Sequence, residues 1–196
     1  MSRIMRALVP AIALLCCMGV AVHARKGAPK NALAFPSLEN CQQKPDSTPF
    51  RLAANITKGM PAQTWCFGFS TAAPTSTSAP CGNAAMLERV QLWAPYTGRT
   101  NITAIRIRDT QGERTVFGAW IKKGATYVDE LVVSKLDWTA QYIQEKNPKI
   151  CLTLNHAIDL DTLCLGPQGQ CTVALYSLGS RGQKCCPVYT TAAPLL

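Results

Sequence analysis

Ten cysteines give this 196-residue chain most of its capacity for chemistry. Thiols form disulfides, bind zinc or act as nucleophiles, and the cellular compartment decides among these uses. Zinc is disfavoured, because no paired C-x-x-C arrangement is present and His156 is the single histidine beyond residue 24. We therefore predict that the thiols are oxidised in pairs in an exported protein, with no metal site.

The start of the chain indicates export. Arg3 and Arg6 precede an apolar run at residues 7–22, and Ala24 closes a stretch of small and medium side chains. A basic start, an apolar centre and an end of small residues before the cleavage site are typical of a secretory signal peptide. A membrane anchor is the alternative, but Pro10 interrupts the run, and about 16 residues fall short of the ~20 that a spanning helix needs. We predict cleavage after Ala24.

Removal of this segment leaves an even number of cysteines, which predicts a disulfide framework. About a hundred connectivities are open to eight cysteines, so the sequence assigns none of them. Adjacent Cys185 and Cys186 are poorly placed to bond each other, so each is predicted to reach a different partner. The predicted disulfide cysteines are Cys41, Cys66, Cys81, Cys151, Cys164, Cys171, Cys185 and Cys186.

Acid–base chemistry has few candidates. Neither a G-x-S-x-G motif nor a cysteine-protease signature accompanies His156. The acidic pairs Asp129–Glu130 and Asp159–Asp161 could supply two carboxylates for glycoside cleavage, but adjacent acids are common on exposed turns. The sequence also lacks a glycine-rich phosphate loop. We predict that the chain is not an enzyme and uses no cofactor.

Short strands are expected to position these residues. Residues 63–70 alternate, with Trp65, Phe67 and Phe69 on one side, which indicates a strand with a buried aromatic face. The pattern as a whole favours a mainly β fold, a disulfide-stapled antiparallel β-sandwich. Further strands are predicted at residues 49–53, 87–93, 102–108, 115–121, 126–136, 150–154 and 171–176.

One or two short helices complete the expected fold. Asp137 is placed to cap a helix from residue 138 to about residue 145, although the Trp, Thr, Tyr and Ile in that stretch also suit a strand. A single helical turn over residues 159–164 would be capped by Asp159 or Asp161. A turn at residues 109–112 is predicted to join its flanking strands into a hairpin.

The charge favours acidic partners over nucleic acid. The whole sequence has a formal net charge of +9, which loss of the signal peptide lowers by about two charges. The basic residues are scattered and form no run of five, which argues against nucleic-acid binding. A basic extracellular surface is better matched to acidic glycans, and a solvated positive face without a partner is the alternative.

Surface modification is also predicted. Asn55 and Asn101 each begin an N-glycosylation sequon, which requires an accessible asparagine. Residues 70–80 are rich in Ser, Thr, Ala and Pro and are expected to form an exposed loop inside the domain.

A set of motifs follows a fixed order along most of the chain, at residues 35–36, 47–52, 65–67, 87–90, 150–154, 162–164, 171–176 and 185–188. In this order the motifs resemble the pherophorin domain, whose family comprises extracellular glycoproteins of volvocine green algae. The resemblance covers roughly residues 35–190. The family usually places a second cysteine where this chain has Gly82, and loss of bonded pairs fits the even number that remains.

The resemblance implies one of two extracellular roles. The long hydroxyproline-rich rod that joins two such domains in structural members is absent from this sequence. A soluble extracellular signal, similar to the sex-inducing pheromone of these algae, is therefore expected first. The alternative is a non-catalytic structural or glycan-binding component of the extracellular matrix or cell wall.

The expected layout follows from these features: a signal peptide at residues 1–24, a flexible basic segment at 25–34, a pherophorin-like domain at 35–190 and a tail at 191–196. The expected location is the extracellular space or matrix, with no membrane insertion after cleavage. The implied partners are matrix glycoproteins, acidic glycans or a cell-surface receptor, and not nucleic acid.

Overall fold

The computed structural model describes residues 35–38, 40–122, 124, 128–155, 158–167 and 170–192. The predicted signal peptide, the basic segment at 25–34, His156 and the tail beyond residue 192 lie outside these residues. Within the described part, no helix is long and apolar enough to cross a membrane.

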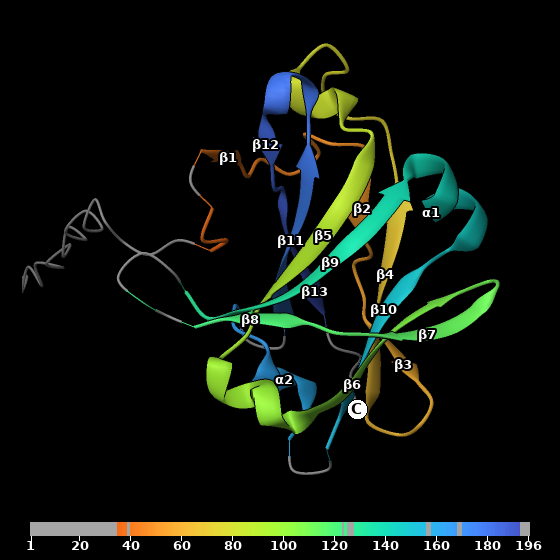
Figure 1. Ribbon diagram of the computed structural model, residues 1–196, viewed down its shortest axis with the longest axis vertical. Helices are drawn as coiled ribbons and strands as arrows, with labels where there is room; N and C mark the ends of the chain where they lie inside the picture. Colours follow the sequence, from red (N-terminus) through yellow and green to blue (C-terminus); the bar gives the residue numbers. More distant parts are fainter. Residues whose placement is uncertain are drawn as a thin grey trace, which may run out of the picture. The chain divides into compact units, whose positions relative to one another are not determined.

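Two β-sheets form the body of the domain (Figure 1). The first sheet has the order β1 (Cys41–Gln42), β12 (Lys184–Cys185), β11 (Gln170–Leu178), β5 (Met86–Trp93), β9 (Glu130–Thr139) and β8 (Ala119–Ile121), with β13 (Val188–Ala192) also paired to β11. The second sheet has the order β2 (Phe50–Leu52), β4 (Thr64–Thr71), β10 (Lys149–Leu154), β6 (Ile102–Asp109) and β7 (Gly112–Val116), with β3 (Thr57–Gly59) also paired to β4. The described strands pair antiparallel except β1 and β12, which are parallel.

The core lies between the two sheets. Side chains alternate across a strand, so one face of each sheet turns inward. The aromatic face predicted for residues 63–70 is confirmed, because Trp65, Phe67 and Phe69 of β4 are all 5% exposed or less. They join Leu131 and Val173 of the first sheet in a single buried cluster. The prediction of a mainly β, disulfide-stapled sandwich with few short helices is therefore confirmed.

Two α-helices and three 3-10 turns connect the strands: α1 (Ala140–Lys146), α2 (Leu160–Leu163), η1 (Pro80–Asn83), η2 (Tyr96–Asn101) and η3 (Ser180–Gly182). The predicted cap of α1 is wrong. Asp137 adopts a left-handed φ of 51° within β9, and Thr139 caps the helix by accepting a hydrogen bond from the Tyr142 backbone N–H at 3.1 Å. Asn147 ends α1 with a left-handed φ of 47°. Asp159 stands at the cap position of α2 but makes no side-chain capping bond.

The single strand predicted at residues 115–121 is also wrong. The hairpin of β6 and β7 is present, but the chain then leaves the second sheet, and β8 pairs with β9 in the first sheet. Gly118 lies at this crossover, where a Cβ atom would stand 2.5 Å from Leu131 Cδ1. A larger residue there would displace the ends of the Leu131 and Ile105 side chains, which pack against Gly118.

Four disulfides tie the elements together. Cys41 bonds Cys186 and Cys81 bonds Cys185, so the two adjacent cysteines reach different partners, as predicted. Cys164 bonds Cys171 across the short connection from α2 to β11. The fourth bridge joins β4 to β10 inside the second sheet. Three of the four bridges therefore fasten the C-terminal strands to the N-terminal half of the chain.

Candidate functional site

The Cys66–Cys151 bridge marks the centre of the outer face of the second sheet. Cys66 and Cys151 are register partners on β4 and β10, with their Cα atoms 4.0 Å apart. Their strand neighbours Trp65 and Leu152 turn to the core, so the two cysteines must turn outward. Even so, Cys66 is only 3% exposed and Cys151 is fully buried. Other side chains must therefore cover the bridge.

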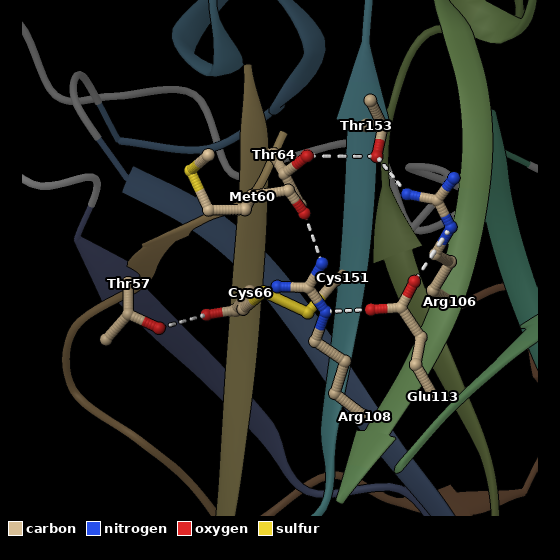
Figure 2. Close-up of a disulfide and its surroundings, with 9 residues drawn as sticks. All are labelled: Thr57, Met60, Thr64, Cys66, Arg106, Arg108, Glu113, Cys151 and Thr153. Atoms are coloured by element: carbon tan, nitrogen blue, oxygen red, sulfur yellow. Dashed lines mark hydrogen bonds and ion pairs between the residues drawn. A yellow bond between two sulfur atoms is a disulfide. The ribbon is translucent and has the colours of Figure 1, made fainter. Parts of the chain in front are cut away.

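Arg108 of β6 provides part of that cover (Figure 2). Its guanidinium extends over the outer face and donates from Nη2 to the backbone carbonyl of Met60, beyond the end of β3. Its Nε forms an ion pair with Glu113 across the β6–β7 hairpin. A Cβ atom on Gly59 would stand 2.9 Å from Arg108 Nη1 and 3.0 Å from the Cys66 sulfur. Glycine at this position lets the β3 hairpin lie close to both.

Arg106 extends the same polar network. Its Nε lies 3.1 Å from the other carboxylate oxygen of Glu113, and its Nη1 donates to the Thr153 hydroxyl at 3.4 Å. Thr153 in turn shares a hydrogen bond of 3.0 Å with the hydroxyl of Thr64. Glu113 thus bonds both arginines, and the hydroxyls of Thr153 and Thr64 connect Arg106 across β10 to β4 (Figure 2).

We call Arg106, Arg108 and Lys149 the arginine face. Lys149 is the register partner of Arg108 on β10 and is partly exposed. The side chains of Arg106 and Arg108 are each 27% exposed. Glu113 pairs with Arg106 and Arg108, and Lys149 forms no ion pair with any described residue, so the face retains a positive charge. Guanidinium N–H groups bind carboxylate and sulfate oxygens well, so this face can hold an anionic ligand.

One guanidinium nitrogen of each arginine forms no hydrogen bond within the described part of the chain. Arg106 uses Nε and Nη1, and Arg108 uses Nε and Nη2, in the bonds given above. Arg106 Nη2 and Arg108 Nη1 donate to no residue in the described part of the chain.

A second polar contact fastens α1 to the β6–β7 turn. The Tyr142 hydroxyl donates to Asp109 Oδ2 at 2.7 Å, and Asp109 Oδ1 accepts from the backbone N–H groups of Gln111 and Gly112. The bond from Tyr142, followed by that from Gln111, lowers the pKa of Asp109. Burial and the same carboxylate raise the pKa of Tyr142 to about 12. This contact holds the hairpin that presents Glu113.

Asp129 and Glu130 bond groups of the domain itself, whereas Asp159 and Asp161 are exposed at α2. Glu130 is fully buried and accepts bonds from the Ser37 backbone N–H and from Gln91 Nε2, both at 2.6 Å. Asp129 accepts a bond of 3.0 Å from the backbone N–H of Tyr96. Asp159 begins α2 and is exposed. His156 lies outside the described residues, so the prediction that the chain is not an enzyme stays a prediction.

The two sequon asparagines occupy different environments. Asn55 is exposed, beside a bridge to Ala192. Asn101 is partly buried at the end of η2, and its side-chain carbonyl accepts a bond of 2.9 Å from Asn155 Nδ2. A glycan attaches through the amide nitrogen, so this bond is compatible with occupancy at Asn101. Glycosylation at both sites stays a prediction.

The sequence contained part of the signal for the arginine face. Arg106 and Arg108 alternate with Ile105 and Ile107, which predicts that both arginines leave the core on the same side. Counting across the turn at residues 109–112 would have brought Glu113 opposite Arg108. No local pattern places β10 beside β6, so Lys149 and Thr153 could not be found in this way.

The fold and this site define a disulfide-stapled β-sandwich domain of the kind found in proteins of oxidising, extracellular compartments. The chain belongs to the pherophorin family, which matches residues 35–187 and confirms the resemblance of the motifs.

A curated relative shares part of its length with this chain. The chain is 29% identical over 170 residues to Perphorin-1 of Volvox carteri, in an alignment that covers 81% of this chain and 31% of that protein. It therefore spans about a third of the length of that relative. Among solved structures, it is similar to the collagen-binding subdomain of the Enterococcus faecalis surface protein ACE, with a TM-score of 0.33, 6% identity, and coverage of 74% of this chain and 96% of that chain. A likeness at this TM-score carries no argument about fold or function.

Proposed function

We propose that this pherophorin-family chain acts outside the cell as a glycoprotein that recognises acidic glycans of the matrix without transforming them. The observation that carries the proposal is the arginine face, where two arginines share the carboxylate of Glu113 and Lys149, the register partner of Arg108, adds a third cation. Guanidinium N–H groups match the acceptor oxygens of uronate and sulfate groups, and one nitrogen of each arginine bonds no described residue. The four disulfides suit a protein that works in an oxidising compartment.

The test is binding of the purified secreted protein to immobilised polygalacturonate and dextran sulfate. The double variant Arg106→Gln/Lys149→Gln removes two charges from the arginine face. We expect its affinity to fall on the order of a hundredfold or more, because two charge-assisted contacts are lost and each is worth roughly 1.5–3 kcal/mol. Binding should also weaken as salt is added, since exposed charges are screened.

A matched control separates the local face from net charge. Lys44 and Lys184 are exposed, and β12, which contains Lys184, lies in the first sheet. Lys44→Gln/Lys184→Gln lowers the net charge by the same amount and should keep most of the affinity. Equal losses in the two double variants would contradict recognition by the arginine face.

A second proposal is that the chain is a soluble extracellular signal, a sex-inducing pheromone. It is supported by membership of the pherophorin family, because the sex-inducing pheromone of volvocine algae is similar to the pherophorin domain. Fractionation with a bioassay distinguishes the two roles. A pheromone should make the culture medium induce sexual development in naive cells at low concentration. A protein found only in the salt-extracted matrix, with inactive medium, would rule this role out.

A further inference from the structure

Phe117 is the most exposed large hydrophobic side chain that the structure describes, at 93%. It follows β7 directly, where the chain leaves the second sheet for β8 in the first. A single exposed apolar side chain is ordinary on a protein surface, so its exposure alone assigns it no role. What distinguishes Phe117 is its position beside the arginine face.

The residues on either side of Phe117 fix the direction of its side chain. Val116 packs against the core cluster. A Cβ atom on Gly118 would also point into the core, 2.5 Å from Leu131 Cδ1 and 2.7 Å from Ile105 Cδ1. Successive side chains of an extended chain alternate, so Phe117, which stands between two inward positions, points away from the core.

This direction brings Phe117 to the edge of the arginine face. Glu113, which bonds both arginines, is in β7, and Thr115 and Phe117 follow it at steps of two residues. Thr115 is the register partner of Arg106 on β6. Phe117 is therefore a diagonal neighbour of Arg106, at about 7–8 Å, a distance that aromatic and long side chains span.

Phe117 and Arg106 offer two different contacts to one ligand. The Arg106 side chain is 27% exposed, and a guanidinium group binds acidic groups well. The face of an aromatic ring is apolar and electron-rich, so it favours flat groups with polarised C–H bonds, such as one side of a pyranose ring. Each residue of an acidic polysaccharide carries both an acidic group and such a ring.

A protein partner matches this edge less well. A standard protein interface buries roughly 800 Å² on each partner and has an apolar centre. No described residue of β6, β7 or β10 is an exposed large hydrophobic, so Phe117 has no apolar neighbours of this kind on those strands. One ring beside a set of cations is a better match to a charged sugar chain.

We infer that Phe117 is a sugar-stacking residue of the arginine face: its ring covers one pyranose of an acidic polysaccharide while Arg106 binds an acidic group of the same chain. The inference deepens the proposed recognition of acidic glycans and rests on it. It gives the face a preference for polyanions that contain sugar rings over polyanions that do not.

Four polymers separate the contribution of the ring from that of charge. Polygalacturonate and polyacrylate both carry carboxylates, dextran sulfate and poly(vinyl sulfate) both carry sulfate esters, and only the first of each pair contains sugar rings. We expect Phe117→Ala to weaken binding of the secreted protein to one or both sugar polymers roughly fivefold, because covering one face of the ring removes about half of its apolar surface from water. Binding to the two ring-free polymers should not change.

Two further variants act as controls. Phe117→Trp keeps a flat ring and should retain the affinity for sugar polymers. Leu178→Ala removes another exposed hydrophobic side chain, in β11 of the first sheet, and should change none of the four affinities. Phe117 is exposed, so Phe117→Ala should leave the midpoint of unfolding in guanidinium chloride unchanged.

The outcomes separate the inference from the proposed function. Equal losses for sugar polymers and ring-free polymers, no loss for either sugar polymer, or a lowered unfolding midpoint in Phe117→Ala would overturn the inference. Self-association in light scattering that Phe117→Ala abolishes would overturn it too, because the ring would then bind a second copy of the chain. If Arg106→Gln/Lys149→Gln loses binding while Phe117→Ala binds as the wild type does, only the inference fails. A wild type that binds neither sugar polymer refutes both.

Discussion

Removing the Cys66–Cys151 bridge should destabilise the domain more than removing the Cys164–Cys171 bridge. A disulfide stabilises chiefly by limiting the unfolded chain, so its contribution grows with the loop that it closes. Cys66 and Cys151 are 85 residues apart, and Cys164 and Cys171 are 7 apart. The Cys81–Cys185 bridge already shortens the loop that Cys66–Cys151 closes, because residues 66–81 and 151–185 are joined through it. The effective loop is then about 50 residues.

These lengths give different costs. In the chain-entropy relation, a loop of about 50 residues corresponds to ~4 kcal/mol and one of about 7 residues to ~2 kcal/mol. We therefore expect Cys66→Ala/Cys151→Ala to lose about 2 kcal/mol more of unfolding free energy than Cys164→Ala/Cys171→Ala. Burial acts in the same direction, because Cys66 is 3% exposed whereas Cys164 is only partly buried.

The assay is equilibrium unfolding in guanidinium chloride, followed by tryptophan fluorescence, for the wild type and both double variants. Mass spectrometry of each variant confirms that the remaining three bridges are formed. Equal losses of unfolding free energy, or a larger loss for Cys164→Ala/Cys171→Ala, would refute the reasoning from loop length.

Three further predictions concern the elements that hold the site. Tyr142, with its pKa raised to about 12 by burial and by Asp109, should show a late step in a tyrosinate absorbance titration that Tyr142→Phe removes. The raised pKa of Tyr142 adds stability below pH ~10, and this stability is lost as the pH rises toward 12. The lowered pKa of Asp109 adds stability that is lost as the pH falls below about 4. A tyrosinate titration that is unchanged in Tyr142→Phe would contradict the raised pKa of Tyr142. Thr139→Ala should cost about 1 kcal/mol of unfolding free energy by removing the cap of α1, whereas Asp137→Ala should remove no cap, and urea midpoints compare the two. Glu113→Gln should cost less than about 1 kcal/mol of unfolding free energy, because its carboxylate is 36% exposed. The same variant should bind dextran sulfate more tightly, because it frees the charge of Arg106 and Arg108. Weaker binding would show that alignment of the arginines matters more than charge.

Local patterns predicted the strands well and the connections poorly. The alternation of Trp65, Phe67 and Phe69 identified β4, because a two-residue period follows directly from strand geometry. The split between β7 and β8 was missed, since residues 112–121 contain no proline and the packing of Gly118 involves Leu131 in a distant strand. The cap of α1 was misplaced by two residues, because both Asp137 and Thr139 are good capping residues and only the backbone decides between them.

The candidate site was harder to predict, because it too depends on contacts between segments that are distant in the sequence. An even number of cysteines predicts that bridges exist, but pairing depends on which strands become neighbours in space. Cys66 and Cys151 meet because β4 and β10 are adjacent in the second sheet. The same adjacency places Lys149 beside Arg108. The buried, unpartnered indole nitrogen of Trp65 was not predicted either, because a tryptophan in an alternating strand gives no sign that its N–H lacks a partner.

The arginine face owes its rigidity to the sheet beneath it. Arg106 and Arg108 lie two residues apart on one strand, about 7 Å along it, and Lys149 lies opposite Arg108 at about 5 Å. Glu113 and the carbonyl of Met60 hold the arginine side chains, while the Cys66–Cys151 bridge holds the strands below. Little conformational freedom then remains to be lost when an anion binds. A fixed arrangement of charges responds to the spacing of acidic groups and not only to their number, which is why two variants of equal net charge are expected to differ in affinity.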